Sequence, residues 1–365
     1  MTASVKSAGI RSIATGFPKT VRDNEWFTEH HPEVFARIKQ NALARVFNPH
    51  AGTAATKPFD EAMEKYLRDP FSGTVHRRIM LAGESQIDLE HDVAMEALQK
   101  AQLAIEDIDM ILVSSFPTEN VGLGDAAFLA KKLGTKRPAI NIETTCSGAL
   151  ACLQIASAMV ASGQARNVLI IVSCIYSKTC DWTDTLTWFL GDAVGAYVVG
   201  EVPAGEGFLG FHAVNTSEVC GGFEYRIESI DELGPRPFIR ANDAAGRAVR
   251  DMTPRAIRDC CAGALQAAGV QVGDVDFFIT NTPLAWFADL FATTLQIPRA
   301  KTISTYAEYA NVGPALNPVN LHRALQVGAI RPNDLVVLFT VGSVSTAQAC
   351  VVRLGELAVG DVVER

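Results

Sequence analysis

The sequence repeats itself at a fixed offset, and this repetition constrains the fold more than any other feature. Residues 97–101 (ALQKA) recur 167 positions later as residues 264–268 (ALQAA). At the same offset and without a gap, residues 107–113 recur as 274–280, and residues 167–172 recur as 334–339. Three matches in one register indicate that the chain contains two copies of one structural unit.

Each copy alternates apolar strand patterns with helical patterns. Continuous Val/Ile/Leu runs such as residues 168–172 are typical of strands that are covered on both faces. Strands that alternate with helices predict an α/β fold, in which a mostly parallel sheet lies between helix layers. Two such units related by a pseudo-twofold axis would bury their central helices between two sheets. The expected architecture is therefore a duplicated set of α-β-α-β-α layers.

A Pro/Gly break at residues 201–205 divides the two copies. It gives an N-terminal half over residues 1–203 and a C-terminal half over residues 204–365. Residues 36–73 have no counterpart in the second copy. We expect them to form an insertion that lies over the surface or over the mouth of a pocket.

Cys146 stands where a short apolar strand pattern (residues 138–142) meets a long helix of small residues. A helix N-terminus favours negative charge, so a cysteine there is expected to ionise and to serve as an acyl-accepting nucleophile. The alternative is a small buried hydrophobic side chain, the common role of a free cysteine. The helix that follows is apolar nearly all round, which predicts that it is buried.

Composition excludes several classes of function. The net charge is −8 and Lys and Arg form no cluster, which argues against a nucleic acid or an anionic membrane as partner. No apolar run approaches the roughly 20 residues that span a bilayer. The eight cysteines and seven histidines lack metal-ligand spacing, and no Gly-rich phosphate loop follows a strand. We therefore expect a cytoplasmic protein with reduced thiols and no cofactor.

Three motifs, read together with the duplication, resemble those of the thiolase superfamily. They are ETTCSG at residues 143–148, FLGDAVGA at residues 189–196 and YANVG at residues 309–313. The sequence is most similar to ketoacyl-ACP synthase III and its acyltransferase relatives. This resemblance implies a thiolase fold and a two-step reaction, in which an acyl group passes from a CoA or carrier-protein thioester to the cysteine and then to a second substrate. It also implies a homodimer, because relatives extend the loop at residues 116–121 across a twofold interface.

The resemblance assigns roles to individual residues. Cys146 is the nucleophile, and Asn311 matches an asparagine that donates to the thioester carbonyl of the second substrate. The backbone N–H groups of Cys146 and of a residue near Ser343 would form the oxyanion hole. The histidine of the family is replaced by Asn281, whose amide donates a hydrogen bond but cannot act as a general base. Glu119 is then the best carboxylate candidate for that base, although most loop glutamates are simply solvated.

Other positions depart from the family pattern at the substrate pocket. Val121 replaces an aromatic residue that limits the acyl tunnel, which predicts a roomier pocket. Trp286 replaces an arginine that docks the carrier protein, and Asp184 lies near a usual CoA-phosphate arginine. We place Phe189 in the same pocket.

These observations predict an enzyme that loads an acyl group on Cys146 and serves a specialised pathway, by atypical condensation or by transfer to an acceptor other than a malonyl thioester. Two alternatives stay open at this point. One is an ordinary 3-oxoacyl-ACP synthase III. The other is a catalytically silent subunit that pairs with an active homologue, which the missing histidine favours and the retained Cys146 and Asn311 oppose.

Overall fold

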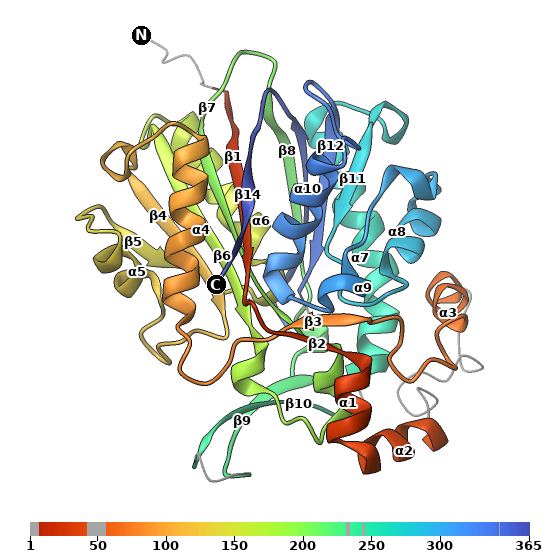
Figure 1. Cartoon of the computed structure of the whole chain (residues 1–365). Helices are drawn as coiled ribbons and strands as arrows, with labels where there is room; N and C mark the ends of the chain where they lie inside the picture. The colour runs from red at the N-terminus through yellow and green to blue at the C-terminus, as the bar shows by residue number, and fades with distance from the viewer. Residues whose placement is uncertain (1–6, 42–55, 231–233, 243–244, 343) are drawn as a thin grey trace.

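Two large sheets and three layers of helices form the framework of the computed structural model (Figure 1). The structure describes residues 7–41, 56–230, 234–242, 245–342 and 344–365. The first sheet has six strands in the order β14-β1-β7-β6-β4-β5. The second has four in the order β11-β12-β13-β8. The strands of the first sheet are β1 (Ala8–Phe17), β4 (Met110–Phe116), β5 (Ala139–Asn141), β6 (Asn167–Ile175), β7 (Asp192–Glu201) and β14 (Ala358–Glu364). Those of the second are β8 (Gly207–Asn215), β11 (Phe277–Thr280), β12 (Leu335–Val341) and β13 (Thr346–Arg353).

Helices cover both outer faces and fill the space between the sheets (Figure 1). One apolar cluster joins α6 and α10 to strands of both sheets, so these two helices form the middle layer. A second cluster packs α4 and α5 on the first sheet, and a third packs α7 and α8 on the second sheet. The helices are α4 (Gln86–Lys100), α5 (Ala126–Lys132), α6 (Gly148–Ala161), α7 (Ala245–Ala268), α8 (Phe287–Leu295) and α10 (Leu316–Gln326). The predicted α-β-α-β-α layers are confirmed.

The duplication seen in the sequence reappears in the strand order. The series β1-β7-β6-β4 of the first sheet matches β8-β13-β12-β11 of the second, and β4 and β11 begin at the expected offset. The copies differ at one edge. The first half has the short strand β5, whereas the corresponding place in the second half holds only an isolated bridge between Phe278 and Thr302.

The helix that follows Cys146 departs from its predicted burial. Residues of α6 that face the sheets, among them Leu150, Leu153 and Ala156, are buried. Gln154 and Ala158 are exposed on the opposite face. The expectation of burial all round was wrong for this face, because small residues such as alanine occur both in cores and on surfaces.

Smaller elements surround this framework at the lower end in Figure 1. They are β2 (Val21–Asp23), β3 (His76–Arg78), α1 (Asn24–His30), α2 (Pro32–Asn41), α3 (Lys57–Glu64), the hairpin β9 (Phe223–Glu228) and β10 (Arg236–Ala241), and α9 (Tyr306–Tyr309). In the expected insertion, residues 42–55 lie outside the described part, and α3 packs on α7 and α8. Arg250 donates to Asp60 of α3 over 2.6 Å, and the two side chains are almost buried.

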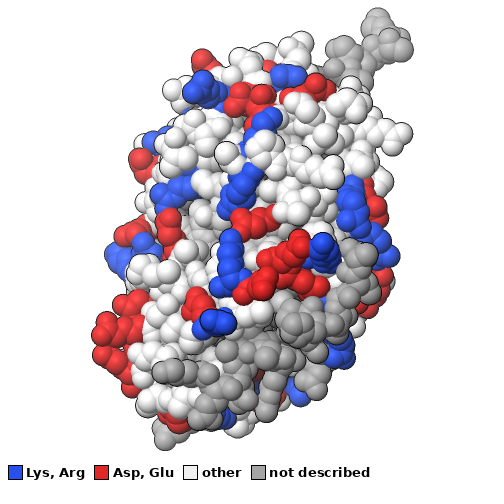
Figure 2. All heavy atoms as spheres, turned by 90° about the vertical axis from the view of Figure 1, so that its right-hand side faces the viewer, with Lys and Arg blue, Asp and Glu red and all other residues white. Residues whose placement is uncertain are grey.

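The division near residue 203 falls in the turn between β7 and β8. Among the described residues, no helix has both the length and the apolar character needed to cross a membrane. Basic and acidic side chains are interspersed on the face that carries α3, α7 and α8 (Figure 2).

Candidate active site

Cys146 lies in a short 3₁₀ turn, Thr145–Ser147, that leads directly into α6. The residue before it, Thr145, has a φ of +52°. A β-branched residue rarely adopts this left-handed conformation, which costs on the order of 1–3 kcal/mol. Glu143 holds the turn in place, because its Oε1 accepts the Thr145 N–H over 2.6 Å. The cysteine is thus presented on a strained corner between a strand and a helix.

Strands of the second half hold this corner from the other side. The Thr340 hydroxyl donates to the carbonyl oxygen of Cys146 over 2.7 Å. The hydroxyls of Ser147 and Thr346 share a hydrogen bond of 2.7 Å. Cys146 therefore sits where the two halves of the molecule meet, as expected for the first residue of a central helix.

A tyrosine that the sequence analysis did not single out lies near the thiol. Tyr176 begins the 3₁₀ turn Tyr176–Thr179 after β6, and its hydroxyl lowers the pKa of both Cys146 and Cys174. Its ring is buried and lies edge-on to Phe116, with 5.8 Å between the ring centroids. The position of Tyr176 directly after a buried strand was a signal, but an aromatic residue there is also typical of a core.

The electrostatic environment keeps the thiol protonated. Burial, together with the nearby Glu143 carboxylate, raises the pKa of Cys146 to about 11. The Tyr176 hydroxyl and the backbone N–H of Cys146 act in the opposite direction, but by less. This direction opposes the expected ionisation of the thiol at the helix N-terminus, because removal of a thiolate from water is costly.

Asn311 also follows a strained residue. Ala310 has φ +60° and ψ −156°, a region that is normally restricted to glycine. The backbone of Asn311 is fixed by two hydrogen bonds, one to the Phe189 carbonyl at 2.9 Å and one from the Gly191 N–H at 3.0 Å. Its side-chain Oδ1 accepts the Gly313 N–H over 2.9 Å, which turns the NH₂ end away from Gly313.

Gly313 lets the turn after Asn311 pack closely against Cys174 and Tyr176. It has a φ of +50°, and a Cβ placed on it would lie 2.7 Å from the Cys174 sulfur and 3.3 Å from the Tyr176 hydroxyl. Only glycine fits such a close approach. The turn Thr145–Ser147 that carries Cys146 also packs against the turn Gly313–Ala315 that follows Asn311, so the structure brings these two predicted residues to one site.

The GDAVGA motif anchors both sides of this site. Gly191 holds Asn311, as described above, and a Cβ on Gly191 would lie 2.3 Å from the Tyr309 carbonyl oxygen. Asp192 is buried and accepts from the N–H and the hydroxyl of Ser177, at 3.0 and 2.5 Å. Because Ser177 is the neighbour of Tyr176, this motif positions the tyrosine as well. Burial raises the pKa of Asp192 to about 6.

Asn281, at the histidine position, is buried and turned toward the backbone. Its Nδ2 donates to the Val341 carbonyl and its Oδ1 accepts the Val341 N–H, both at 3.1 Å. The side chain thereby extends the pairing of β11 with β12 by one step. Asn281 is not among the groups that shift the pKa of Cys146.

Glu119 is also placed away from the thiol. Its two oxygens accept from the Ser85 hydroxyl at 3.3 Å, from the Gln86 N–H at 2.6 Å and from the Lys178 ammonium at 2.8 Å. These contacts cap the N-terminus of α4. The carboxylate that acts on Cys146 is instead Glu143, which the sequence analysis quoted only as part of a motif.

The remaining predicted residues are dispersed. Ser343 lies outside the described residues. Val121 is 74% exposed on the surface of the chain. Trp286 is buried beneath the insertion, against the rings of Phe59 and Tyr66 at centroid distances of 6.1 and 5.8 Å. Of the three residues placed in the pocket, only Phe189 adjoins the site, through its carbonyl bond to Asn311.

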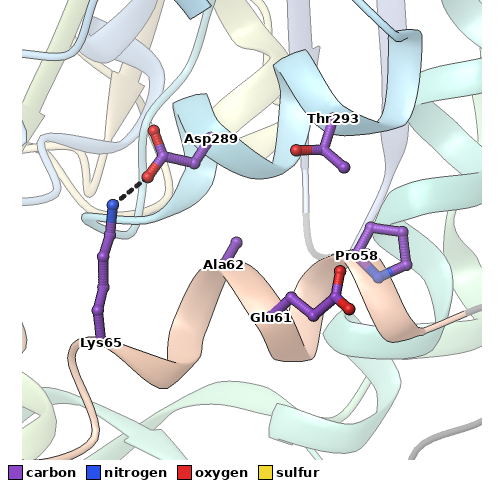
Figure 3. Close-up of a pocket in the computed structure, with 6 residues that line it drawn as sticks. All are labelled: Pro58, Glu61, Ala62, Lys65, Asp289 and Thr293. Atoms are coloured by element: carbon purple, nitrogen blue, oxygen red, sulfur yellow. Dashed lines mark hydrogen bonds and ion pairs between the residues drawn. The ribbon is translucent and has the colours of Figure 1, made fainter.

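A separate surface groove runs between α3 and α8 (Figure 3). Lys65 reaches across it to Asp289, and Ala62 lies at its floor. Its lining shares no residue with the surroundings of Cys146. Among the described residues, no group of His, Cys, Asp and Glu could hold a metal ion.

Comparisons with known proteins show what this chain is similar to. The model of the 3-oxoacyl-[acyl-carrier-protein] synthase III family matches residues 140–217, and the model of its C-terminal part matches residues 265–354. A beta-ketoacyl-[acyl-carrier-protein] synthase III of Geobacillus kaustophilus is 29% identical over 286 residues, covering 78% of this chain and 88% of that protein. A Deinococcus radiodurans synthase III is 28% identical over 286 residues, covering 77% and 83%.

Solved structures agree with the fold. The 3-oxoacyl-[acyl-carrier-protein] synthase III of Aquifex aeolicus gives a TM-score of 0.76 at 24% identity, covering 95% of this chain and 99% of that one. OleA of Xanthomonas campestris gives 0.73 at 18% identity, covering 95% and 99%. Over these residues the sequence of this chain is therefore similar to that of the 3-oxoacyl-[acyl-carrier-protein] synthase III enzymes, and the chain has the same fold.

Proposed function

We propose that this protein takes an acyl group from a thioester onto Cys146 and passes it to a second substrate in a specialised pathway. The observation that carries the proposal is the meeting of two strained turns. Thr145 precedes Cys146 and Ala310 precedes Asn311, and both have positive φ. Backbone strain of this kind persists where the surrounding structure fixes it, and it clusters at functional sites. A protein that had lost its chemistry would have no use for either turn.

The position of Asn281 supports an atypical second step. Condensation with a malonyl thioester needs donors aimed at the developing enolate oxygen, and loss of one such donor costs about 10²–10³ in rate. Asn311 retains an NH₂ group for this task, but the Asn281 amide is engaged with Val341. We therefore expect slow malonyl condensation and turnover with an acceptor that supplies its own activated nucleophile.

The nature of the acyl donor follows from the charges near Asp184. Arg240 is bonded to Asp181 at 2.9 Å, to Asp184 at 3.2 Å and to Glu228 at 2.5 Å. Three carboxylates around one guanidinium leave a negative surplus, which opposes the binding of a nucleotide phosphate. We expect an acyl group to load from its CoA ester no faster than from its pantetheine ester. A marked preference for the CoA ester would contradict this part of the proposal.

A second copy of the chain is the expected partner. β5 is the edge strand of the first sheet, and its Ile140 is exposed. Beside it, Val121, Leu123 and Phe128 are also exposed, and Asn141 of β5 binds the Leu123 carbonyl over 3.2 Å. An apolar patch on a free strand edge favours pairing with another sheet. We propose that two copies pair here as a homodimer in the cytoplasm.

The test is intact-mass analysis after incubation with thioesters of increasing chain length, carried by CoA, pantetheine or acyl carrier protein. Wild type should gain one acyl mass, Cys146→Ala should gain none, and Cys152→Ala should behave as wild type. Absence of any adduct would favour the silent subunit. Rapid condensation with malonyl carrier protein would favour the ordinary synthase III, the enzyme after which the relatives from Geobacillus kaustophilus and Deinococcus radiodurans are named.

A further inference from the structure

The turn that carries the nucleophile belongs to the first half of the molecule, but hydroxyl groups of the second half hold it. Thr340 of β12 donates to the Cys146 carbonyl over 2.7 Å. The hydroxyl of Ser147 is bonded to that of Thr346 on β13 over 2.7 Å, and it also donates to the Thr144 carbonyl over 2.6 Å. Because a hydroxyl has one hydrogen, Thr346 is the donor in its pair with Ser147. Two threonine hydroxyls of the second sheet therefore donate into this turn.

The bond from Thr340 completes a set that fixes the peptide groups on both sides of Cys146. The carbonyl of the preceding peptide, that of Thr145, accepts the Gly148 N–H. In the peptide that follows, the Ser147 N–H donates back within the 3₁₀ turn over 3.3 Å, and the carbonyl accepts from Thr340. With both peptide planes held, the Cys146 N–H keeps one direction relative to the side chain that carries the sulfur.

Thr340 is itself held rigidly. Its side chain is fully buried, and a β-branched side chain has few rotamers. Its strand, β12, lies inside the second sheet between β11 and β13, where Thr340 is in register with Gln348. The carbonyl of the preceding residue, Phe339, accepts the Nδ2 of Asn317 on α10 over 3.2 Å. A hydroxyl on so rigid a support is suited to aligning a reacting group.

We propose that Thr340 is a positioning residue for acyl transfer: its hydroxyl orients the backbone of Cys146 so that the Cys146 N–H points at the oxygen of the attacked thioester carbonyl. The inference rests on the proposed function and deepens it, since it names a residue outside the sequence motifs that makes the expected oxyanion donor effective.

The chemical step shows where this orientation acts. The Cys146 sulfur adds to the carbonyl carbon of the thioester, and the electron pair of the C=O double bond moves to the oxygen. The Cys146 N–H donates to the oxyanion that forms in this way. The oxyanion then collapses, and the bond between the carbon and the donor sulfur breaks. The proton that Cys146 released ends on this departing sulfur, so the donor leaves as a thiol, while Thr340 neither gains nor loses a proton.

The experiment compares two rates at Cys146 in the same variants. Acyl loading from acetyl, octanoyl and dodecanoyl pantetheine, followed by intact mass, needs the oxyanion donor. Alkylation by iodoacetamide forms no oxyanion and reports only on the thiol. Thr340→Val exchanges the hydroxyl for a methyl group of similar size. It should slow loading on the order of 10–100-fold, while alkylation changes by less than about twofold.

Three further variants complete the comparison. Thr340→Ser keeps the hydroxyl and should load at close to the wild-type rate, which a purely steric role of Thr340 does not predict. Thr340→Ala should behave like Thr340→Val, and it replaces the valine variant if that variant does not fold. Thr302→Val is the matched control and should leave both rates unchanged. Thr302 is also a buried threonine of the second half, and within the described residues its hydroxyl has no hydrogen-bond partner.

The outcomes separate the inference from the proposed function. Slower loading with normal alkylation in Thr340→Val, rescued in Thr340→Ser, supports the inference. Equal loading in wild type and Thr340→Val overturns it and leaves the proposed function standing. Loading and alkylation that slow by the same factor also overturn it, because the substitution then disturbs the thiol and not the oxyanion donor. If neither these thioesters nor the same acyl groups on carrier protein load wild type, the inference and the proposed function both fail.

Discussion

The side-chain amide of Asn281 forms two hydrogen bonds with the backbone of Val341. In this it takes the place of one more peptide group in the sheet. One end donates to the Val341 carbonyl and the other accepts the Val341 N–H, each over 3.1 Å. This relationship fixes the backbone at the end of β12, next to Gly342, and it holds the Asn281 amide, which cannot act as a general base, in two hydrogen bonds.

Asn281→Ala should therefore destabilise the fold. The substitution leaves the N–H and the carbonyl of Val341 buried without these partners, at a cost of roughly 2–3 kcal/mol in the free energy of unfolding. Denaturant titration measures the loss, and the exposed Gln266→Ala on α7 is the control that should show none. Asn281→His should also destabilise, since an imidazole cannot reproduce both bonds, and it should not add malonyl decarboxylation. A stable Asn281→His variant with faster decarboxylation would contradict this role.

Glu90 makes stability depend on pH. It is fully buried under the first sheet, and its Oε1 accepts from Gln86, Ser115 and Ser173 at 3.1, 2.9 and 2.5 Å. Burial, and then the charge of Asp125, raise the pKa of Glu90 to about 7. The folded state thus binds a proton more tightly than the unfolded state, so this group lowers stability as pH rises from about 4.5 to about 7.

Glu90→Gln should remove this dependence while keeping an acceptor at Oε1. We expect the variant to gain on the order of 1–3 kcal/mol over wild type at pH 8, and to gain little at pH 5. Urea unfolding at the two pH values measures the difference, with the exposed Glu106→Gln as control. A gain of equal size at both pH values would show that packing, and not titration, is responsible.

The halves of the molecule and the corner that holds Cys146 were predictable, because a repeat in register and a strand-to-helix junction leave a clear pattern in the sequence. The groups that surround Cys146 were not. Tyr176 lies on a separate turn after β6 and lowers the pKa of Cys146, but its sequence pattern is that of an ordinary core residue. Glu119 looked like a free loop carboxylate, and only the fold shows that it caps α4. Contacts between distant segments have no local signature, so such assignments need coordinates.

Ile140→Lys tests the proposed dimer. A charge in the middle of the exposed edge strand β5 would be buried without a partner if two copies pair there, so we expect a shift from dimer to monomer. Light scattering at micromolar concentration measures the oligomeric state directly. Ile227→Lys is the matched control, because Ile227 is equally apolar and 70% exposed but lies on the β9–β10 hairpin. A wild type that is monomeric, or a variant that remains dimeric, would exclude this edge as the interface.

Glu143→Gln distinguishes two roles for the carboxylate nearest the nucleophile. The negative charge of Glu143 raises the pKa of Cys146, so its removal should lower that pKa and make alkylation by iodoacetamide several-fold faster at pH 8. The glutamine oxygen can still accept the Thr145 N–H, which keeps the strained turn intact. If Glu143 instead acted as a general base, the same variant would load acyl groups more slowly. Glu119→Gln serves as the comparison, because Glu119 caps α4 away from the thiol. It should weaken the fold and leave the alkylation rate of Cys146 unchanged.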